Sequence, residues 1–261
     1  RDLRMSRGLG DVYKRQGIWI LFYNRHLFYV HRRDFWLFIG SGMIGMTALS
    51  VFYNISVTKG SLALSAVLLA MSPVFVLFLA AIFFHEPITR HKLTCVTLAL
   101  IGCVLVSGVL ESNGLSWSIT GILCGILASF FYAVYGIISK KVTQKGYHFL
   151  TITFYGTLFS GMTMLPFSNI HSLSSMIVSG QRTTFFILII HALVSSVLPY
   201  ALYSLSMRYM EAGKASILAS SEPAAAMLFG AVLYAETPGI LSICGLCFTI
   251  TAVILLNYER N

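Results

Sequence analysis

Charged residues are scarce in this sequence. Only 10% of its 261 residues are Asp, Glu, Lys or Arg and 57% are hydrophobic, whereas a soluble domain contains about 25% charged and about 45–50% apolar residues. Apolar runs of about 20 residues, the length of a membrane-spanning helix, recur along the chain. The alternating pattern of an outer-membrane barrel is missing. These features predict an all-α polytopic membrane protein embedded in a lipid bilayer.

Clusters of catalytic or metal-binding side chains are also missing. The seven histidines lie mainly in loops, without the HExxH motif or carboxylate pair that metal or acid–base chemistry would need. Cys244 and Cys247 form a CxxC inside an apolar run with no second pair nearby, which favours packed thiols over a metal site or a disulfide. A phosphate loop of the form GxxxxGKS or GxxxxGKT is absent. We therefore expect no catalytic residue, no metal and no cofactor, and a protein that is not an enzyme.

Basic residues alternate between the loops. Eleven lie in every second loop, whereas the loops between them contain only Lys59 and Arg182. Since cytoplasmic loops carry the excess of Lys and Arg, we expect a multi-pass protein of the plasma (bacterial inner) membrane with a cytoplasmic C-terminus. This topology accounts for the net charge of +9 and argues against nucleic acid as a partner. The eleven residues are Arg25, Arg32, Arg33, Arg90, Lys92, Lys140, Lys141, Lys145, Arg208, Lys214 and Arg260.

Residues 1–16 differ from the rest of the chain. They contain five basic and two acidic residues, and the apolar run GIWILFY follows them directly. The stretch MSRGLGDVYKRQ resembles a translated sequencing adapter, so we expect a non-native artefact; a basic cytoplasmic tail is the alternative. About eight full spans then follow a short remnant at 17–23, near 35–57, 62–84, 91–110, 118–139, 149–167, 183–206, 212–235 and 238–257.

The chain resembles itself at an offset of 150 residues. MSPVFVLFLAAIFFHE (71–86) falls on SEPAAAMLFGAVLYAE (221–236), which pairs Pro73 with Pro223. The same offset places FYNIS on LYSLS in a separate span. One offset that serves two helices indicates an internal repeat.

The two copies are expected to be inverted. The loop after Glu86 should be cytoplasmic and the loop after Glu236 external, so each half needs an odd number of spans, and five fit the second half. Extending the offset backward implies a ten-helix parent from which roughly 48 native residues are missing here. The expected parts are the artefact 1–16, a truncated first repeat 17–110 (end of helix 2 to helix 5), a linker 111–117, a second repeat 118–257 (helices 6–10) and a cytoplasmic tail 258–261.

Two five-helix inverted halves, each with a P-x12-E helix just before its last helix, resemble the EamA type of the drug/metabolite transporter superfamily. The resemblance covers residues 17–257 and is carried by SEPAAAMLFGAVLYAETP and MSPVFVLFLAAIFFHEPIT. It implies a membrane permease for small metabolites, often an exporter, with the substrate cavity between the halves. The family's first helix and most of its second are not present in this chain.

Glu222 and Pro223 interrupt an apolar run near the expected membrane midplane. They lie about ten residues, roughly 15 Å, into a helix that starts near residue 212. Proline removes a backbone donor and displaces a carbonyl, which is tolerated at that depth only against protein or a wet cavity. Pro73 has the same depth in its own span, and paired broken helices point to a transporter's binding site. A packing kink is the alternative interpretation.

Glu222 is the acidic residue placed at mid-span, and Ser72 is its counterpart in the other half. A charge there costs at least ~2.5–3.5 kcal/mol, so Glu222 should face the cavity, have a partner or be protonated. We expect it to bind the amine of a cationic or zwitterionic substrate or to carry a coupling proton. A protonated carboxyl bonded to a neighbouring helix is the alternative.

Further polar residues are candidates of lower rank. Glu86 and Glu236 lie at helix ends and are expected to cap the adjoining helix N-terminus. His191 is a second coupling candidate, although a packed neutral histidine is the commoner case. Tyrosines near span ends more often form an interfacial belt. The remaining candidates for the cavity are Tyr53, Asn54, Tyr132, Tyr135, Tyr155, Tyr200, Tyr203 and Ser204.

The substrate class is predicted from where positive charge is missing. Every Lys and Arg lies at or beyond a span end, so the midplane offers no fixed cation to a phosphate, although helix N-termini could partly substitute. We expect a permease that exports a small neutral, zwitterionic or cationic metabolite such as an amino acid by alternating access, with proton coupling as an option. The alternatives are another solute class such as a nucleotide sugar or drug, a non-transporting scaffold and, last, a membrane-embedded enzyme. A homodimer is compatible with the sequence.

Overall fold

The computed structural model describes residues 29–107, 109–110, 118–164, 187, 190–191, 193–234 and 238–258, and these residues contain helices but no strands. The chain divides into two units, Arg1–Trp36 and Leu37–Asn261. The second unit contains almost all of the described helices. The expectation of an all-α polytopic membrane protein is confirmed.

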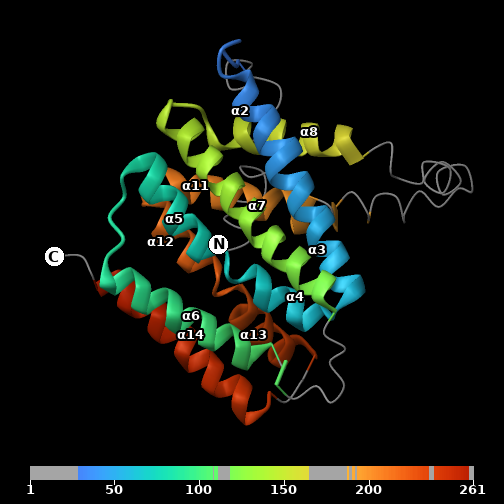
Figure 1. Ribbon diagram of the computed structural model, residues 1–261, viewed down its shortest axis with the longest axis vertical. Helices are drawn as coiled ribbons and strands as arrows, with labels where there is room; N and C mark the ends of the chain where they lie inside the picture. The colour runs from blue at the N-terminus through green and yellow to red at the C-terminus, as the bar shows by residue number, and fades with distance from the viewer. Residues whose placement is uncertain are drawn as a thin grey trace, which may run out of the picture. The chain divides into compact units, whose positions relative to one another are not determined.

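The described helices follow the expected apolar runs (Figure 1). They are α2 (Phe35–Ile39), the π-helical stretch η2 (Gly40–Thr47), α3 (Ala48–Lys59), α4 (Leu62–Leu69), α5 (Ser72–Phe84), α6 (Arg90–Val106), α7 (Ile119–Gln144), α8 (Phe149–Met164), the π-helical stretch η4 (Leu193–Val197), α11 (Leu198–Tyr209), α12 (Ala212–Ala219), α13 (Glu222–Tyr234) and α14 (Ile240–Tyr258).

Five helical segments within the described residues are long and apolar enough to cross a membrane: Phe35–Lys59, Leu62–Phe84, Ile119–Gln144, Ala212–Leu233 and Ile240–Tyr258. Helices α6, α8 and α11 occupy the other three expected spans. The number of spans in the whole protein stays a prediction. The expected remnant at 17–23 and the linker at 111–117 lie outside the described residues.

Helix boundaries recur at the offset found in the sequence. The break between α4 and α5 falls at Ala70–Met71, and the break between α12 and α13 falls 150 residues later at Ser220–Ser221. Helices α11 and α14 likewise begin 150 residues after α3 and α6. Pro73 lies in the first turn of α5 and Pro223 in that of α13, where a missing N–H costs no intrahelical hydrogen bond. Each proline therefore lies in the first helical turn after a two-residue interruption of its span.

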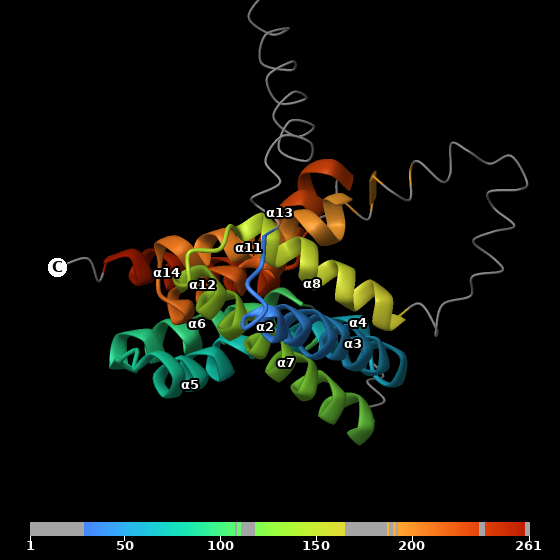
Figure 2. The same ribbon diagram turned by 90° about the horizontal axis from the view of Figure 1, so that it is seen from above.

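Helix α7 lies at the centre of the packing. It contacts α3, α4, α5 and α11, and α3 lies beside it in both views (Figure 1 and Figure 2). The largest described core joins η2, α5, α7, α11 and α12, and each of these elements contributes buried side chains. Its members include Val76 and Ala80 of α5, Ala133 and Tyr135 of α7, Tyr203 and Met207 of α11, and Ala212 and Ala215 of α12.

Helices α6 and α14 pack through a pair of glycines. A Cβ atom on Gly102 would lie 2.8 Å from the carbonyl oxygen of Gly245, and a Cβ on Gly245 would lie 2.7 Å from the carbonyl oxygen of Gly102. Small residues allow membrane helices to approach this closely. The two glycines thus set the distance between α6 and α14, which lie side by side (Figure 1).

We expect Gly102→Ala to destabilise the protein, because the new methyl group would have to push α14 away. Overpacking of this kind costs about 1–3 kcal/mol. The matched control is Gly161→Ala in α8, where an added Cβ meets nothing within 4 Å and helix propensity alone favours alanine by up to about 1 kcal/mol. Thermal unfolding of both variants in detergent measures the difference. An unchanged unfolding temperature for Gly102→Ala would contradict this packing.

Candidate functional site

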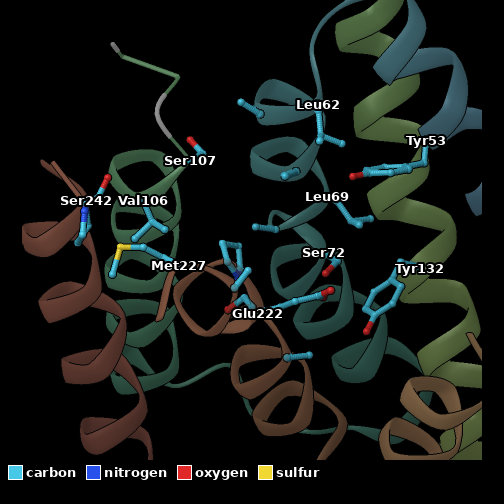
Figure 3. A pocket seen from close by; sticks show the side chains of 18 of the residues that line it. Tyr53, Leu62, Leu69, Ser72, Val106, Ser107, Tyr132, Glu222, Met227 and Ser242 are labelled. Atoms are coloured by element: carbon cyan, nitrogen blue, oxygen red, sulfur yellow. The ribbon is translucent and has the colours of Figure 1, made fainter. Parts of the chain in front are cut away.

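A cavity of about 840 Å³ opens where the two broken helices meet. Residues of α3, α4, α5, α6, α7, α12, α13 and α14 line it, and most of them are small or apolar. Figure 3 shows Glu222 between Ser72 and Tyr132 on one side and Val106 and Ser242 on the other. The polar lining residues are Tyr53, Ser72, Ser107, Tyr132, Ser220, Glu222 and Ser242.

The helix breaks supply the backbone geometry of the cavity. The hydroxyl of Ser220 donates to the carbonyl of Ile217, and the hydroxyl of Ser221 donates to that of Leu218, both at 2.7 Å. These bonds satisfy carbonyls at the end of α12 that a continuous helix would have bonded internally. Beyond the breaks, α5 begins at Ser72 and α13 at Glu222, and both residues line the cavity. Two helix N-termini, each with a partial positive charge, therefore lie at the cavity wall.

Glu222 is the charged side chain among the described residues that line the cavity. It is solvent-exposed in the described part of the chain, whereas its counterpart Ser72 is 5% exposed. Since no Lys or Arg lines the cavity in that part, the carboxylate has no fixed cation there to neutralise it. Glu222 therefore supplies the formal charge of the described lining.

The two ends of the bundle carry different charge. The cavity lies toward the end with the α4 N-terminus and the α14 N-terminus. The opposite end contains Lys140, Lys141, Lys145 and Arg208. There, burial lowers the pKa of His148, and the Arg208 guanidinium lowers it further, which keeps this imidazole neutral near pH 7. The acidic group and the basic residues thus lie at different levels of the bundle.

A smaller cavity of about 270 Å³ adjoins the first one. The two share Tyr132, Ala219 and Glu222, while Tyr203 and Met210 line only the smaller cavity. The hydroxyl of Tyr203 is buried and has no hydrogen-bond partner among the described residues. Glu222 therefore borders a second, partly polar space directed toward the basic end of α11.

A tyrosine cluster joins α7 to α11 behind the cavities. The rings of Tyr132 and Tyr203 have centroids 5.2 Å apart, and those of Tyr135 and Tyr200 are 5.1 Å apart. The hydroxyl groups of Tyr135 and Ser204 are 2.9 Å apart and share a hydrogen bond. Tyr135 and Ser204 are both fully buried, so they support the wall formed by Tyr132 without reaching the cavity.

Four further sequence candidates lie away from the cavity lining. Asn54 is exposed and donates to the Ser50 carbonyl of its own helix at 2.8 Å. Pro73 is buried, and Tyr155 packs against the ring of Phe38. His191 is exposed. The site prediction thus includes residues that support the helices as well as residues that line the cavity.

Glu86 caps a helix, but not the adjoining one. Its carboxylate accepts hydrogen bonds from the backbone N–H groups of Ala212 (3.1 Å) and Gly213 (3.3 Å) at the start of α12. The adjoining helix α6 is capped by Thr89, whose hydroxyl accepts from the N–H of Lys92 at 3.2 Å. Glu236 lies outside the described residues.

Sequence reasoning missed three serines of the cavity. Ser107 and Ser242 lie near span ends, where serine is common, so nothing in the sequence marks them. Ser220 directly precedes the second break and could have been found as the hydroxyl that bonds the freed carbonyls. All three extend the polar strip of the cavity beyond Glu222.

Comparisons with known proteins agree with this architecture. The sequence pattern of the EamA-like transporter family matches residues 17–108 and 119–258. An uncharacterized transporter of Archaeoglobus fulgidus is 24% identical over 84% of this chain and 76% of its own length. The uncharacterized transporter YdfC of Bacillus subtilis is 22% identical over 83% of this chain and 71% of its own length. A solved structure titled "Crystal structure of protein" has a TM-score of 0.69 at 12% identity, covering 85% of this chain and 76% of that one.

A cysteine scan of α13 tests whether the cavity contains water. In a background with Cys244 and Cys247, the exposed cysteines, replaced by serine, we expect Ala226→Cys to react readily with a water-soluble maleimide because residue 226 is exposed and lines the cavity. The matched control Ala224→Cys lies two residues away at a position that is 5% exposed and should react slowly, because only a hydrated thiolate is the nucleophile. Equal rates at the two positions would contradict a wet cavity.

Proposed function

The chain belongs to the EamA-like transporter family and is a membrane permease, and from this premise we propose that it exports a small zwitterionic or cationic metabolite, such as an amino acid. One observation carries the proposal: the cavity at the helix breaks contains the carboxylate of Glu222 and, within the described lining, no basic side chain.

Electrostatics separates the candidate substrates. An ammonium group in contact with a carboxylate gains about 4 kcal/mol at an effective dielectric constant of 20, and a phosphate at the same place loses a comparable amount. No described Lys or Arg of the cavity would offset that loss. Cationic and zwitterionic solutes are therefore favoured over sugar phosphates and nucleotide sugars.

The N-terminus of α5 favours a zwitterion over a simple cation. Ser72 begins this helix and lines the cavity opposite Glu222. A carboxylate near a helix N-terminus gains about 0.3–1 kcal/mol, and up to about 2 kcal/mol when partly buried. The α13 N-terminus has Glu222 in its own first turn, so the α5 N-terminus is the one left for a substrate carboxylate.

Competition for Glu222 would couple transport to protons. A carboxylate that binds either a substrate ammonium or a proton releases one when it takes the other. If the cavity faces each side of the membrane in turn, a proton entering the cell is exchanged for a substrate leaving it. With the basic end of the bundle on the cytoplasmic side, this exchange drives export.

Transport by a Glu222→Gln variant tests the proposal. We expect efflux of the substrate to fall at least about tenfold and its dependence on external pH to vanish, because glutamine can neither exchange a proton nor balance an ammonium. The matched control is Asn54→Ala, a polar position outside the cavity, which should transport like the parent. A Glu222→Gln variant with the parent's rate and pH dependence would exclude this role.

Ligand-induced stabilisation of the purified protein identifies the solute class independently of transport. A substrate at 100 times its Kd raises the free energy of unfolding by about 2.7 kcal/mol. We expect amino acids or small amines to raise the unfolding temperature of the parent and not that of Glu222→Gln. Stabilisation by sugar phosphates instead would favour a different solute class, and no stabilisation by any solute would favour a scaffold.

A further inference from the structure

The bundle is joined by polar contacts at one end and open at the other. At the basic end, side chains at the end of α5 and the start of α6 bind the start of α12. At the opposite end, the segments that correspond to these at the 150-residue offset both line the 840 Å³ cavity.

Glu86 provides the first contact. The chain leaves α5 at His85, whose left-handed backbone (φ 56°) ends the helix. The Glu86 carboxylate then accepts the N–H groups of Ala212 and Gly213. The N-cap residue of α12, Glu211, makes no side-chain cap of its own. Glu86 is thus the described group that satisfies the first donors of α12, and it comes from a different part of the chain.

Lys92 provides the second contact. Its side chain is 2% exposed, and its ammonium group lies 2.5 Å from the carboxylate of Glu211. The same group donates to the Pro87 carbonyl at 3.0 Å. A buried ammonium must be paired, since breaking such a pair leaves an uncompensated charge. Separating α6 from α12 would therefore expose or strand this charge.

Lys140 adds a third link at the same end. Its ammonium group donates to the carbonyls of Met207 (2.9 Å) and Met210 (2.6 Å), where α11 ends. Because α7 also packs against α3, α4 and α5, this contact joins that group of helices to α11.

The corresponding segments at the other end border the cavity. Ala212 and Gly213 correspond to Leu62 and Ala63 at the offset of 150, and the segment after Glu86 corresponds to the one that includes Pro238 and Gly239. These four residues all border the cavity. The α4 N-terminus is capped locally, by the Ser61 hydroxyl that accepts from the N–H of Leu64 at 3.1 Å.

We propose that Glu86, Lys92 and Glu211 form a latch that closes the basic end of the bundle. The latch must open when the cavity becomes accessible from that side of the membrane. This proposal rests on the alternating-access permease proposed above. The latch residues do not line the cavity, so they position the helices and do not bind the substrate.

Site-directed labelling tests the latch. A reporter Ala215→Cys, at a core position of α12 that is 3% exposed, is placed in the background with Cys244 and Cys247 replaced by serine. With Glu86→Ala added, we expect maleimide applied from the basic end to label this cysteine about tenfold faster, because α12 loses its cap. Labelling of Ala226→Cys in the cavity should fall in the same variant.

Charge exchange provides the second arm. Lys92→Glu and Glu211→Lys should each raise labelling of Ala215→Cys, and the double variant should return it toward the parent rate. The matched control is Ala128→Cys, a 0% exposed position of α7, whose labelling should stay low throughout. Unchanged labelling of Ala215→Cys in folded Glu86→Ala would overturn the latch. Faster labelling at Ala128→Cys as well would mean general loosening and would also overturn it.

The latch and the permease fail in different ways. Labelling reports access and needs no substrate, whereas the role of Glu222 is read from efflux and from ligand-induced stabilisation. If labelling of Ala215→Cys is unchanged by Glu86→Ala while Glu222→Gln loses efflux, the latch is overturned and the proposed function stands. If Glu86→Ala speeds labelling of Ala215→Cys while Glu222→Gln keeps normal efflux, the latch is supported and the proposed role of Glu222 in substrate binding is overturned.

Discussion

Two breaks in the backbone of membrane-spanning helices determine this structure. In lipid every backbone N–H and C=O must have a partner within the protein, so a helix can stop at mid-span only where other groups replace its hydrogen bonds. Here Ser220 and Ser221 bond the carbonyls left at the end of α12, and the prolines lie in first turns where no donor is required. Polar side chains near the breaks, among them Ser72, Ser220 and Glu222, line the cavity there.

The breaks also bring the start of α13, with Glu222, and the start of α5, with Ser72, to the cavity wall. Each break brings a helix N-terminus to the wall, and each N-terminus is favourable for negative charge. The protein fills one of them with Glu222 in the first turn of α13 and leaves Ser72 at the other. The described lining contains no basic side chain beside Glu222.

Local patterns in the sequence predicted the membrane helices, the breaks and the place of Glu222 beside one break, because each depends on hydrophobicity or on proline within a few residues. The role of Glu222 stays a prediction. The direction of a single side chain was harder to predict. Tyr53 lines the cavity while Asn54 does not, since consecutive residues of an α-helix point about 100° apart. Glu86 was expected to cap the next helix, yet it binds a helix more than 100 residues away. Such long-range partners depend on tertiary packing, which spacing along the chain does not contain.

Among the described residues, the N-termini of α4 and α12 are capped in different ways. The Ser61 hydroxyl accepts from the N–H of Leu64 in the first turn of α4, so this cap is local to its own helix. Helix α12 begins with Glu211, which does not cap it, and relies on Glu86 from across the bundle. Opening the basic end would therefore cost the cap, about 0.5–2 kcal/mol, in addition to the Lys92–Glu211 pair. One or two kcal/mol corresponds to a factor of about 5–30 in a two-state population, so under the proposed alternating access these contacts would favour the arrangement in which the basic end is closed.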